Sequence, residues 1–370
     1  MAWGWCGLGE CFRPCARTNG RRNMNDQRRN GQNETAAGGR PTLKTIAFMT
    51  GLGVTTVSRA LKDAPDIGEE TKKRVQLVAR QVGYRPNRAG VRLRTGKTNV
   101  ISLVLNTDEQ LMGFISDIIY GVSEELAESS YHLILTPYSS RNDPMDPIRY
   151  VVETHSADGV IISQTEPNDP RVRYLTEHRF PFATHGRTHT GIEHPWHDFD
   201  NHAFAVQAVR ALVAKGRRRL ALLAPSPKLT YYRHMSDGFA EGIEEQGCNA
   251  IPFHDAWVDM PIERIKTAAM ALLRRGAPPD GLVSGSGAGA FALVAAIEEC
   301  GLQLGRDIDI VTKQSTPLVQ MFRPQILVVN EDFRLAGREL ARAVRASIDG
   351  AASASLQTLA VPSGVEGSRT

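Results

Sequence analysis

The sequence predicts a small all-α helix-turn-helix domain followed by an α/β core of two parallel-sheet subdomains. Two observations carry this prediction. Before residue 83, apolar residues recur at helical spacing around a glycine-rich turn. From Asn99 onward, short apolar strands alternate with helices, which is typical of parallel sheets with right-handed crossovers. At 370 residues and 41% hydrophobic content, the chain is long enough for more than one domain.

The N-terminal domain, expected over residues 41–87, contains three helices. A tight turn at 51–53 separates the first helix from the second, which runs from Val54 to Leu61. This is the outline of a helix-turn-helix, whose second helix enters the major groove of DNA. A third helix is expected over Glu69 to Val82, and its apolar face comprises Val75, Val78, Ala79 and Val82.

Positive charge is concentrated at the end of this domain. The whole chain has a net charge of only +4, yet two basic stretches without acids lie between Lys72 and Lys97. Such a concentration is expected of a module that contacts phosphates, and the alternative is a solvated basic helix face. The members are Lys72, Lys73, Arg74, Arg80, Arg85, Arg88, Arg92, Arg94 and Lys97.

Residues 1–40 are rich in Gly, Asn and Arg and have no apolar period, which predicts a disordered leader. A more ordinary leader begins at Met24, so we expect translation to start there. The chain has no signal-peptide pattern and no apolar run of membrane-spanning length. The five cysteines are scattered and suit a reducing cytoplasm: Cys6, Cys11, Cys15, Cys248 and Cys300. We expect no metal site at the first three of them.

The core is expected to contain more strands than one sheet holds comfortably, so we predict two subdomains. A ligand would lie between them, at the C-terminal ends of the strands. Helices are expected at 112–129 and 148–155. The predicted strands are 100–105, 132–138, 158–163, 181–185, 219–225, 280–285 and 307–312.

Residues 42–96 resemble the DNA-binding headpiece of the lactose and galactose repressor family. The resemblance implies a transcriptional repressor of carbohydrate or polyol genes that binds a palindromic operator as a homodimer. It also implies a small sugar or polyol effector, with no cofactor. The matching motifs are Thr56-Val57-Ser58-Arg59-Ala60-Leu61, Glu70-Thr71, Arg74-Val75, Gly83-Tyr84-Arg85-Pro86-Asn87 and Leu93-Arg94-Thr95-Gly96.

The resemblance places residues from the second helix against DNA. Val54, Thr55 and Arg59 match positions that face base edges, and Arg59 is able to make a bidentate contact with guanine. Thr56 and Ser58 match phosphate contacts, which fix orientation without reading sequence. The alternative for this last pair is simple helix packing.

A hinge is implied at residues 88–97, immediately after Asn87, which also matches a DNA contact. Leu93 matches the leucine that wedges between bases in the minor groove. Gly90 stands where relatives more often carry alanine, so this hinge should depend more on DNA for its helical order.

Residues 98–362 resemble the family's sugar-sensing core, which is similar to a periplasmic sugar-binding protein, and Asp332-Phe333-Arg334-Leu335-Ala336-Gly337 is close to the family pattern at the second crossing. In that family the chain crosses between subdomains three times. We therefore expect one subdomain over 98–190 with 331–350 and the other over 191–330 with 351–362. The tail, 363–370, lacks a leucine heptad, which favours a homodimer over a tetramer.

Several residues align with effector contacts of the family. Trp257 is expected to stack on a sugar face, with Gln314 and Lys313 beside it where strands ending near 253–257 and 307–312 converge. Either tryptophan of the set is alternatively a buried core residue. The full set is Asn106, His185, Arg187, Trp196, Arg233, Trp257, Ser286, Lys313, Gln314 and Glu331.

This chain also departs from the family pattern. Ser286-Gly287 replaces an Asn-Asp pair, and 313–315 replaces paired acids. Met235 stands where an arginine is usual, with Arg233 two residues earlier. The carboxylates that normally bind sugar hydroxyls are thus missing and positive charge is added, which leaves a polyol, a disaccharide or an acidic sugar open.

Two patterns suggest other functions. Residues 285–290 satisfy the GxGxxG/A spacing of dinucleotide sites, but small residues at a strand–helix turn beside a cleft explain them better. Four histidines in one irregular loop lack matched acids, so we expect no metal: His185, His189, His194 and His197.

The rival functions are an exported solute-binding protein and a nicotinamide-dependent enzyme. The first is opposed by the missing signal peptide, and both are opposed by the headpiece. No nucleophile–base constellation can be assembled from the sequence, so we expect no catalytic activity.

Overall fold

The computed structural model describes residues 40–85, 92, 96–106, 114–139 and 141–367. The chain divides into two compact units, residues 1–86 and 87–370. Residues 1–39 of the expected leader, Asn87 and most of the expected hinge, including Leu93, lie outside the described residues.

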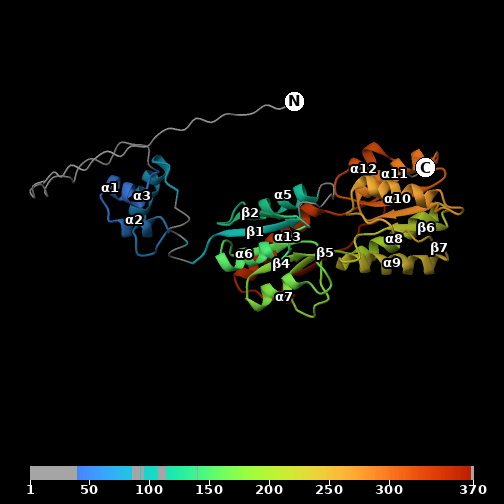
Figure 1. Cartoon of the computed structure of the whole chain (residues 1–370). Coiled ribbons are helices and arrows are strands. Elements are labelled where there is room, and N and C mark those ends of the chain that lie inside the picture. Colours follow the sequence, from blue (N-terminus) through green and yellow to red (C-terminus); the bar gives the residue numbers. More distant parts are fainter. Residues whose placement is uncertain (1–39, 86–91, 93–95, 107–113, 140, 368–370) are drawn as a thin grey trace, which may run out of the picture. The chain divides into compact units, whose positions relative to one another are not determined.

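The first unit is a three-helix domain (Figure 1). Thr42 caps the first helix by accepting a hydrogen bond from the backbone N–H of Thr45, and Gly51, at φ 68°, ends it. Gly53 precedes the second helix and offers no side-chain cap. The domain core joins Ile46, Val57, Ala60 and Val75 from all three helices. The helices are α1 (Leu43–Thr50), α2 (Val54–Ala60) and α3 (Glu69–Gln81).

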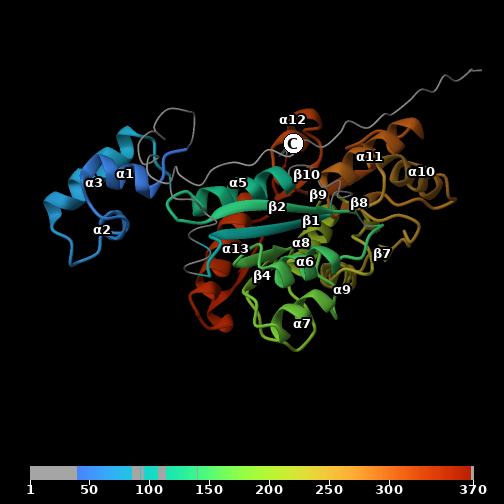
Figure 2. The same ribbon diagram turned by 60° about the vertical axis from the view of Figure 1, so that its left-hand side comes forward.

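The second unit contains two parallel sheets, as the sequence predicted (Figures 1 and 2). The first sheet has six strands in the order β11-β5-β4-β3-β1-β2. Its strands are β1 (Val100–Asn106), β2 (His132–Tyr138), β3 (Gly159–Ile162), β4 (Phe182–His185), β5 (Trp196–Phe199) and β11 (Gln357–Ala360).

Helices cover both faces of the first sheet. Successive side chains of β1 point to opposite faces, so they pack against different helices. Leu103 packs with α5 and α13 on one face, and Val104 packs with α6 and α7 on the other. The helices are α5 (Phe114–Leu126), α6 (Asp146–Thr154), α7 (Pro170–Glu177) and α13 (Phe333–Ile348), with a short 3-10 helix η1 (Ser353–Leu356) before β11.

The two longest helices of this layer, α5 and α13, cross at glycines. A Cβ on Gly121 would lie 2.0 Å from the carbonyl oxygen of Arg334, and one on Gly337 would lie 2.4 Å from that of Ile118. Each glycine therefore lets the other helix approach to backbone contact.

The second sheet has five strands in the order β10-β9-β8-β6-β7. Helices α8 and α9 pack on one face, and α10 and α11 on the other. The strands are β6 (Arg219–Leu223), β7 (Asn249–Ala250), β8 (Gly281–Ser284), β9 (Asp309–Gln314) and β10 (Leu327–Asn330). The helices are α8 (Asn201–Ala214), α9 (Thr230–Gln246), α10 (Ile262–Leu273), α11 (Gly287–Glu299) and α12 (Leu318–Phe322).

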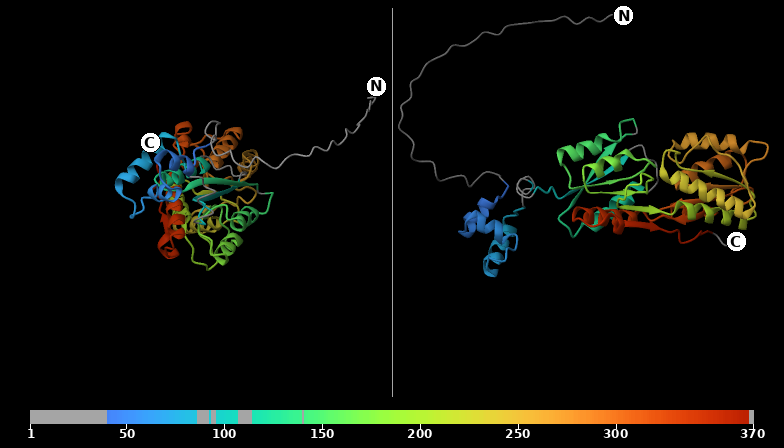
Figure 3. Two further views of the ribbon diagram at one scale, coloured as in Figure 1. Left: turned by 90° about the vertical axis from the view of Figure 1, so that its left-hand side faces the viewer. Right: turned by 90° about the horizontal axis from the view of Figure 1, so that it is seen from below.

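The chain crosses between the sheets three times: between β5 and α8, between β10 and α13, and after β11 (Figure 3). After the last crossing, Glu366 pairs with Val328 through two backbone hydrogen bonds of 2.7 Å. The described part of the tail is therefore attached to the second sheet.

The predicted subdomain boundaries differ from those in the structure. We expected 191–330 and 351–362 in the second subdomain, but β5 pairs with β4, and β11 pairs with β5. Both strands thus belong to the first sheet. β5 was not predicted because its sequence, WHDF, is half polar, and the first crossing consequently falls at Asp200 rather than at 191.

The expected strand end at 253–257 is also absent, because β7 stops at Ala250, just before Pro252. Among the described residues, no helix has the length and apolar character needed to cross a bilayer.

Candidate functional site

Helix α2 has one buried and one exposed side. Val57 and Ala60 are fully buried against the other helices, whereas Val54, Thr55 and Arg59 are exposed. The three residues predicted to read bases therefore share the side that is open to a partner.

The remaining predicted contacts of α2, Thr56 and Ser58, are half-buried. Arg59 makes an ion pair with Asp66, and both side chains are about half exposed. To contact guanine, Arg59 would have to leave the carboxylate of Asp66 and bind O6 and N7 of the base. An exposed ion pair such as Arg59–Asp66 contributes only about 0–1 kcal/mol. The pair is thus a small obstacle to DNA binding.

Two members of the basic stretch stabilise the domain itself. Lys72 Nζ lies 2.7 Å from Asp63 Oδ1 and 2.8 Å from Glu69 Oε1, and these hydrogen bonds raise the pKa of Lys72. Arg74 donates to the carbonyl oxygen of Thr50 at the end of α1, at 2.7 Å. The stretch itself contains no acidic residue, but Asp63 and Glu69, which precede it in the sequence, lie against Lys72 in the structure. The other described residues of the three-helix domain that belong to it are exposed: Lys73, Arg80 and Arg85.

A cavity lies between the two sheets of the second unit, at the C-terminal ends of their strands. Its volume is about 810 Å³, part of which is open to solvent. The lining residues are Phe114, Gln164, His185, Gly186, Asp198, Asn201, Tyr231, Val258, Gly285, Ser286, Gly287, Lys313, Gln314, Ser315, Thr316, Val319, Glu331 and Phe333.

A buried ion pair lies in the wall of this cavity. Lys313 Nζ, at the end of β9, is 2.7 Å from Glu331 Oε2, after β10. It also donates to Asn201 Oδ1 at 2.9 Å and lies over the ring of Phe199 at 5.2 Å. The side chains of Lys313 and Glu331 are 9% and 8% exposed.

A second carboxylate, Asp198, lines the cavity from β5. Its Oδ2 accepts a hydrogen bond of 2.7 Å from Arg187 Nε, and its Oδ1 accepts one of 2.9 Å from the backbone of Phe199. His234, on α9, lies 4.0 Å from the same Asp198 Oδ2. Desolvation and the neighbouring Arg187 lower the pKa of His234.

One wall carries a buried hydrogen-bond acceptor that lacks a partner. Gln314 Nε2 donates to Asn330 Oδ1 at 3.1 Å and to Gln320 Oε1 at 3.4 Å. Gln314 Oε1, by contrast, makes no hydrogen bond. Because leaving a buried acceptor unsatisfied is costly, this oxygen is well suited to a ligand hydroxyl.

Aromatic side chains form the apolar walls. Phe114 packs edge-on against Phe333, with 5.0 Å between ring centroids, and lies 5.4 Å from the ring of His185. Tyr231, at the start of α9, lines the cavity as well. His185 exposes surface only in part, and burial lowers its pKa to about 3, with His197 and Lys313 acting in the same direction. His185 is therefore neutral at physiological pH.

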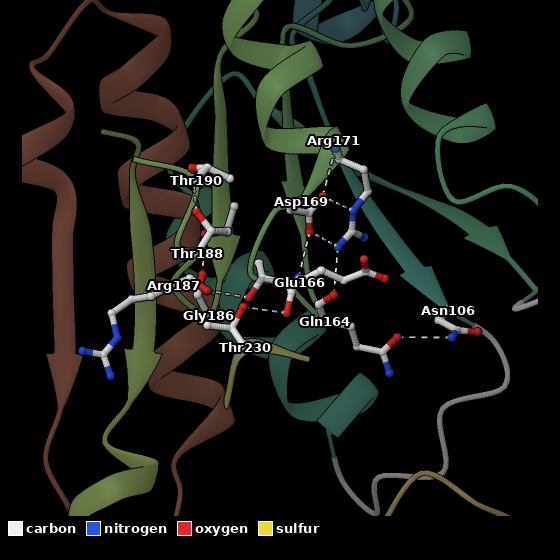
Figure 4. Close-up of polar contacts among 12 residues, drawn as sticks. Asn106, Gln164, Glu166, Asp169, Arg171, Gly186, Arg187, Thr188, Thr190 and Thr230 are labelled. Atoms are coloured by element: carbon white, nitrogen blue, oxygen red, sulfur yellow. Dashed lines mark hydrogen bonds and ion pairs between the residues drawn. The ribbon is translucent and has the colours of Figure 1, made fainter. Parts of the chain in front are cut away.

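The loop after β3 presents Gln164 to the cavity from a left-handed backbone conformation, φ 53°. A buried ion pair holds this loop: Asp169 accepts two side-chain hydrogen bonds from Arg171, and Arg171 Nη2 donates to the carbonyl oxygen of Gln164 at 2.9 Å (Figure 4). Asn106 donates to Gln164 Oε1 at 3.2 Å. The strained residue is thus fixed from both sides.

The same loop is hydrogen-bonded to the other subdomain. The backbone N–H and the hydroxyl of Thr230, on α9, both donate to the carbonyl oxygen of Thr165, at 2.9 Å and 3.0 Å (Figure 4). Thr165 and Thr230 follow Gln164 and precede Tyr231, respectively, so this clasp fixes two lining residues relative to each other across the cavity.

The structure brings five of the ten predicted effector residues to the cavity wall: His185, Ser286, Lys313, Gln314 and Glu331. Asn106 and Arg187 lie behind the wall, hydrogen-bonded to the lining residues Gln164 and Asp198.

The other three predicted residues do not line the cavity. The ring of Trp196 lies under Arg187, 5.6 Å away. Arg233 is on the outside of α9, where its side chain is 71% exposed and paired with Asp237. Trp257 is half-buried, and its neighbour Val258 takes the place at the wall.

The sequence analysis missed several residues of the wall, and the omission of Asp198 changes its conclusion. We expected carboxylates to be missing at two family positions, but Asp198 supplies one from β5, in addition to the predicted Glu331, which follows β10. Asp198 could have been found only by recognising β5 as a strand. Gln164 closely follows β3, which is the signal that would have indicated it, whereas Tyr231 lies on the first turn of α9, well beyond the end of β6 at Leu223.

The glycine motif has a packing explanation. Ser286 caps α11 by accepting from the N–H of Gly289 at 3.0 Å. A Cβ on Gly289 would lie 2.9 Å from Leu223 Cδ2, so the glycine allows close contact between helix and strand. Within the described residues, no group of three or more His, Cys, Asp or Glu side chains is placed to hold a metal.

A helix-turn-helix domain joined to an α/β unit with a cavity at the strand ends between its two sheets defines a class, the ligand-responsive DNA-binding regulators. Residues 42–87 match the profile described as bacterial regulatory proteins, lacI family. Residues 209–368 match that of a periplasmic binding protein-like domain.

Relatives match over most of the chain. The HTH-type transcriptional regulator AglR of Rhizobium meliloti (strain 1021) is 33% identical over 314 residues, which are 81% of this chain and 86% of AglR. The HTH-type transcriptional regulator RafR of Escherichia coli is 31% identical and covers 87% of this chain and 96% of RafR. The chain therefore belongs to the lacI family of bacterial regulatory proteins.

Solved structures share the fold. The transcriptional regulator CelR in complex with cellobiose has a TM-score of 0.65 and 24% identity, over 88% of this chain and 98% of that one. The lac repressor dimer bound to operator and the anti-inducer ONPF has a TM-score of 0.74 and 19% identity, over the same shares of 88% and 98%.

Proposed function

We propose that this protein is a sequence-specific transcriptional repressor whose operator binding is switched by a small sugar or polyol. The observation that carries the proposal is that one chain holds both a recognition helix with exposed predicted base-reading residues and a cavity between two subdomains lined by polar and aromatic side chains. We propose further that it acts without catalysis, in the cytoplasm, where its DNA target lies.

The chemistry of the cavity supports a carbohydrate. Sugar hydroxyls both donate and accept, and the wall offers the acceptors Gln314 Oε1, Asp198 and Glu331. Aromatic faces at Phe114 and Tyr231 suit the apolar face of a sugar ring. CelR, a relative of the same fold, has been solved with cellobiose.

Dimerisation is part of the proposal, since a palindromic operator mirrors a two-fold protein. The first sheet ends at β2, an edge strand that exposes Ile134 and Leu135, and Tyr120 is exposed on neighbouring α5. Exposed apolar residues on adjacent elements are suited to contact with a second copy. The solved lac repressor relative is a dimer on its operator.

The switch would work through closure of the two subdomains. A ligand that contacts both walls favours one arrangement of the sheets over the other, which is the condition for any coupling. A change in that arrangement would move the two segments at 88–97 of a dimer relative to each other, and with them Leu93, the proposed minor-groove wedge.

The test combines selected DNA sites with salt titration. Palindromic sites enriched from a random duplex library should bind with a steep salt dependence, and Arg59→Ala should relax preference at one base pair per half-site, by roughly 1–3 kcal/mol. The control is Lys73→Ala, which should weaken all sites equally.

Enrichment of no site, together with a flat salt dependence, would favour the rival solute-binding function. An equal loss across all site variants for Arg59→Ala would mean that Arg59 contacts phosphate alone.

A further inference from the structure

We propose that the cavity selects uncharged carbohydrates and rejects sugar acids and sugar phosphates, and that Glu331 sets this selectivity. The inference rests on the proposed function and specifies its ligand class. It removes the acidic sugar that the sequence had left open.

The charged side chains of the wall are already paired with one another or with a neighbour. Among its described residues, the side chains charged at neutral pH are Asp198, Lys313 and Glu331. Lys313 is paired with Glu331, and Asp198 is paired with Arg187, both at 2.7 Å. Each charge already has an opposite partner, so no net positive charge remains to receive an anion.

The Lys313–Glu331 pair is buried. With the side chains 9% and 8% exposed, water cannot replace a lost partner. A ligand carboxylate that took Lys313 would leave Glu331 buried and unpaired, beside a second negative charge. Breaking a buried pair in this way is strongly unfavourable.

Two other features of the wall could attract an anion, namely His185 and the N-terminus of α11. His185 is neutral because burial lowers its pKa to about 3. The N-terminus of α11 carries only a partial positive charge, and the side chain of Ser286 already accepts from one of its N–H groups, that of Gly289, at 3.0 Å. Neither His185 nor the N-terminus of α11 therefore provides a full positive charge for an anion to pair with.

A neutral sugar avoids these costs. Its hydroxyls donate to Glu331 and to Gln314 Oε1 without separating Lys313 from Glu331. A hydroxyl also accepts from Lys313, whose ammonium has three N–H groups, of which Glu331 and Asn201 receive two.

The test asks whether Glu331→Gln shifts the preference of the cavity from neutral sugars towards sugar acids. Thermal shift and calorimetry at pH 7 and constant ionic strength would compare wild type and Glu331→Gln with three pairs of probes: glucose and glucuronate, galactose and galacturonate, and cellobiose and cellobionate. Inorganic phosphate is a fourth probe that needs no sugar recognition.

Wild type should be stabilised only by neutral members. Glu331→Gln leaves Lys313 uncompensated and should shift the acid-to-neutral affinity ratio by roughly tenfold or more towards the acid, with new stabilisation by phosphate. The double variant Lys313→Met, Glu331→Gln, which removes both charges, should lose the gain.

The control is Glu299→Gln, which releases Lys266 on the surface with the same change in net charge and should not alter any probe. Wild type binding an acid as well as its neutral partner would overturn the inference. So would a Glu331→Gln variant that folds, as judged by urea denaturation, and responds to phosphate like wild type.

If no neutral sugar stabilises wild type while Glu331→Gln gains the phosphate response, the charge argument stands and the carbohydrate function fails. If Glu331→Gln does not fold, the double variant should fold and bind neutral sugars alone, and its binding of acids would contradict the proposal.

Discussion

The clasp between Thr165 and Thr230 should set effector affinity without choosing the effector. Two hydrogen bonds from Thr230 converge on one carbonyl oxygen, and the two residues are 0% and 1% exposed. Thr230→Val replaces the hydroxyl with a methyl group of similar size and keeps the bond from the backbone N–H. The change therefore removes one of the two bonds and little packing.

The magnitude follows from the loss of one buried hydrogen bond, about 1 kcal/mol net. That corresponds to roughly fivefold in the equilibrium between the arrangement seen here and a more open one. If ligands bind the clasped arrangement, their apparent affinity falls with its population. Thr230→Val should thus weaken every effector by up to about fivefold and by the same factor.

Calorimetry with two sugars that bind wild type would measure this, with Thr230→Ser as the control that keeps the hydroxyl. The ratio of the two dissociation constants should be the same in all three proteins. An effect on one sugar alone would show that Thr230 touches the ligand, and unchanged affinities would show that the clasp does not contribute to closure. Urea denaturation would separate either result from global unfolding.

Two further predictions concern stability. Gly337→Ala should destabilise the second unit by about 1–3 kcal/mol in urea denaturation, because a Cβ would lie 2.4 Å from the carbonyl oxygen of Ile118. The control Gly276→Ala, which has nothing within 4 Å, should change stability by no more than about 0.5 kcal/mol, and equal effects would refute the packing argument. Stability should also fall as the pH is lowered from about 6.5 towards 4. Burial lowers the pKa of His194 to about 4, so the unfolded chain takes up a proton in this range that the folded protein does not. His194→Gln should reduce the dependence, and an unchanged slope between pH 7 and pH 5 would contradict this.

The sequence by itself determined the elements whose information is local. The bounds of α2 and α3 follow from helical spacing and from the turn at Gly51, and the structure agrees to within one residue at each end. The parallel α/β class was equally legible, because strands buried on both faces, such as β1, read as continuous apolar runs. Neither needed knowledge of distant contacts.

Only the tertiary structure decided which sheet each late strand joins. β5 and β11 are four residues each and partly polar, and Trp196–Phe199 becomes a strand through its pairing with Gln357–Ala360, far along the chain. An isolated antiparallel bridge attaches Glu366 to Val328 on the edge strand β10.

For the cavity, too, the sequence predicted some features and only the tertiary structure showed the others. The positions of Lys313 and Gln314 at a strand end were readable from the sequence, but their partners were not, because Glu331, Asn201 and Asn330 arrive from other elements. Likewise, Lys72 belongs to a basic run in sequence and is neutralised in space by Asp63 and Glu69. Charge balance depends on distances of a few ångströms between residues that the order of the chain separates, so folding alone determines it.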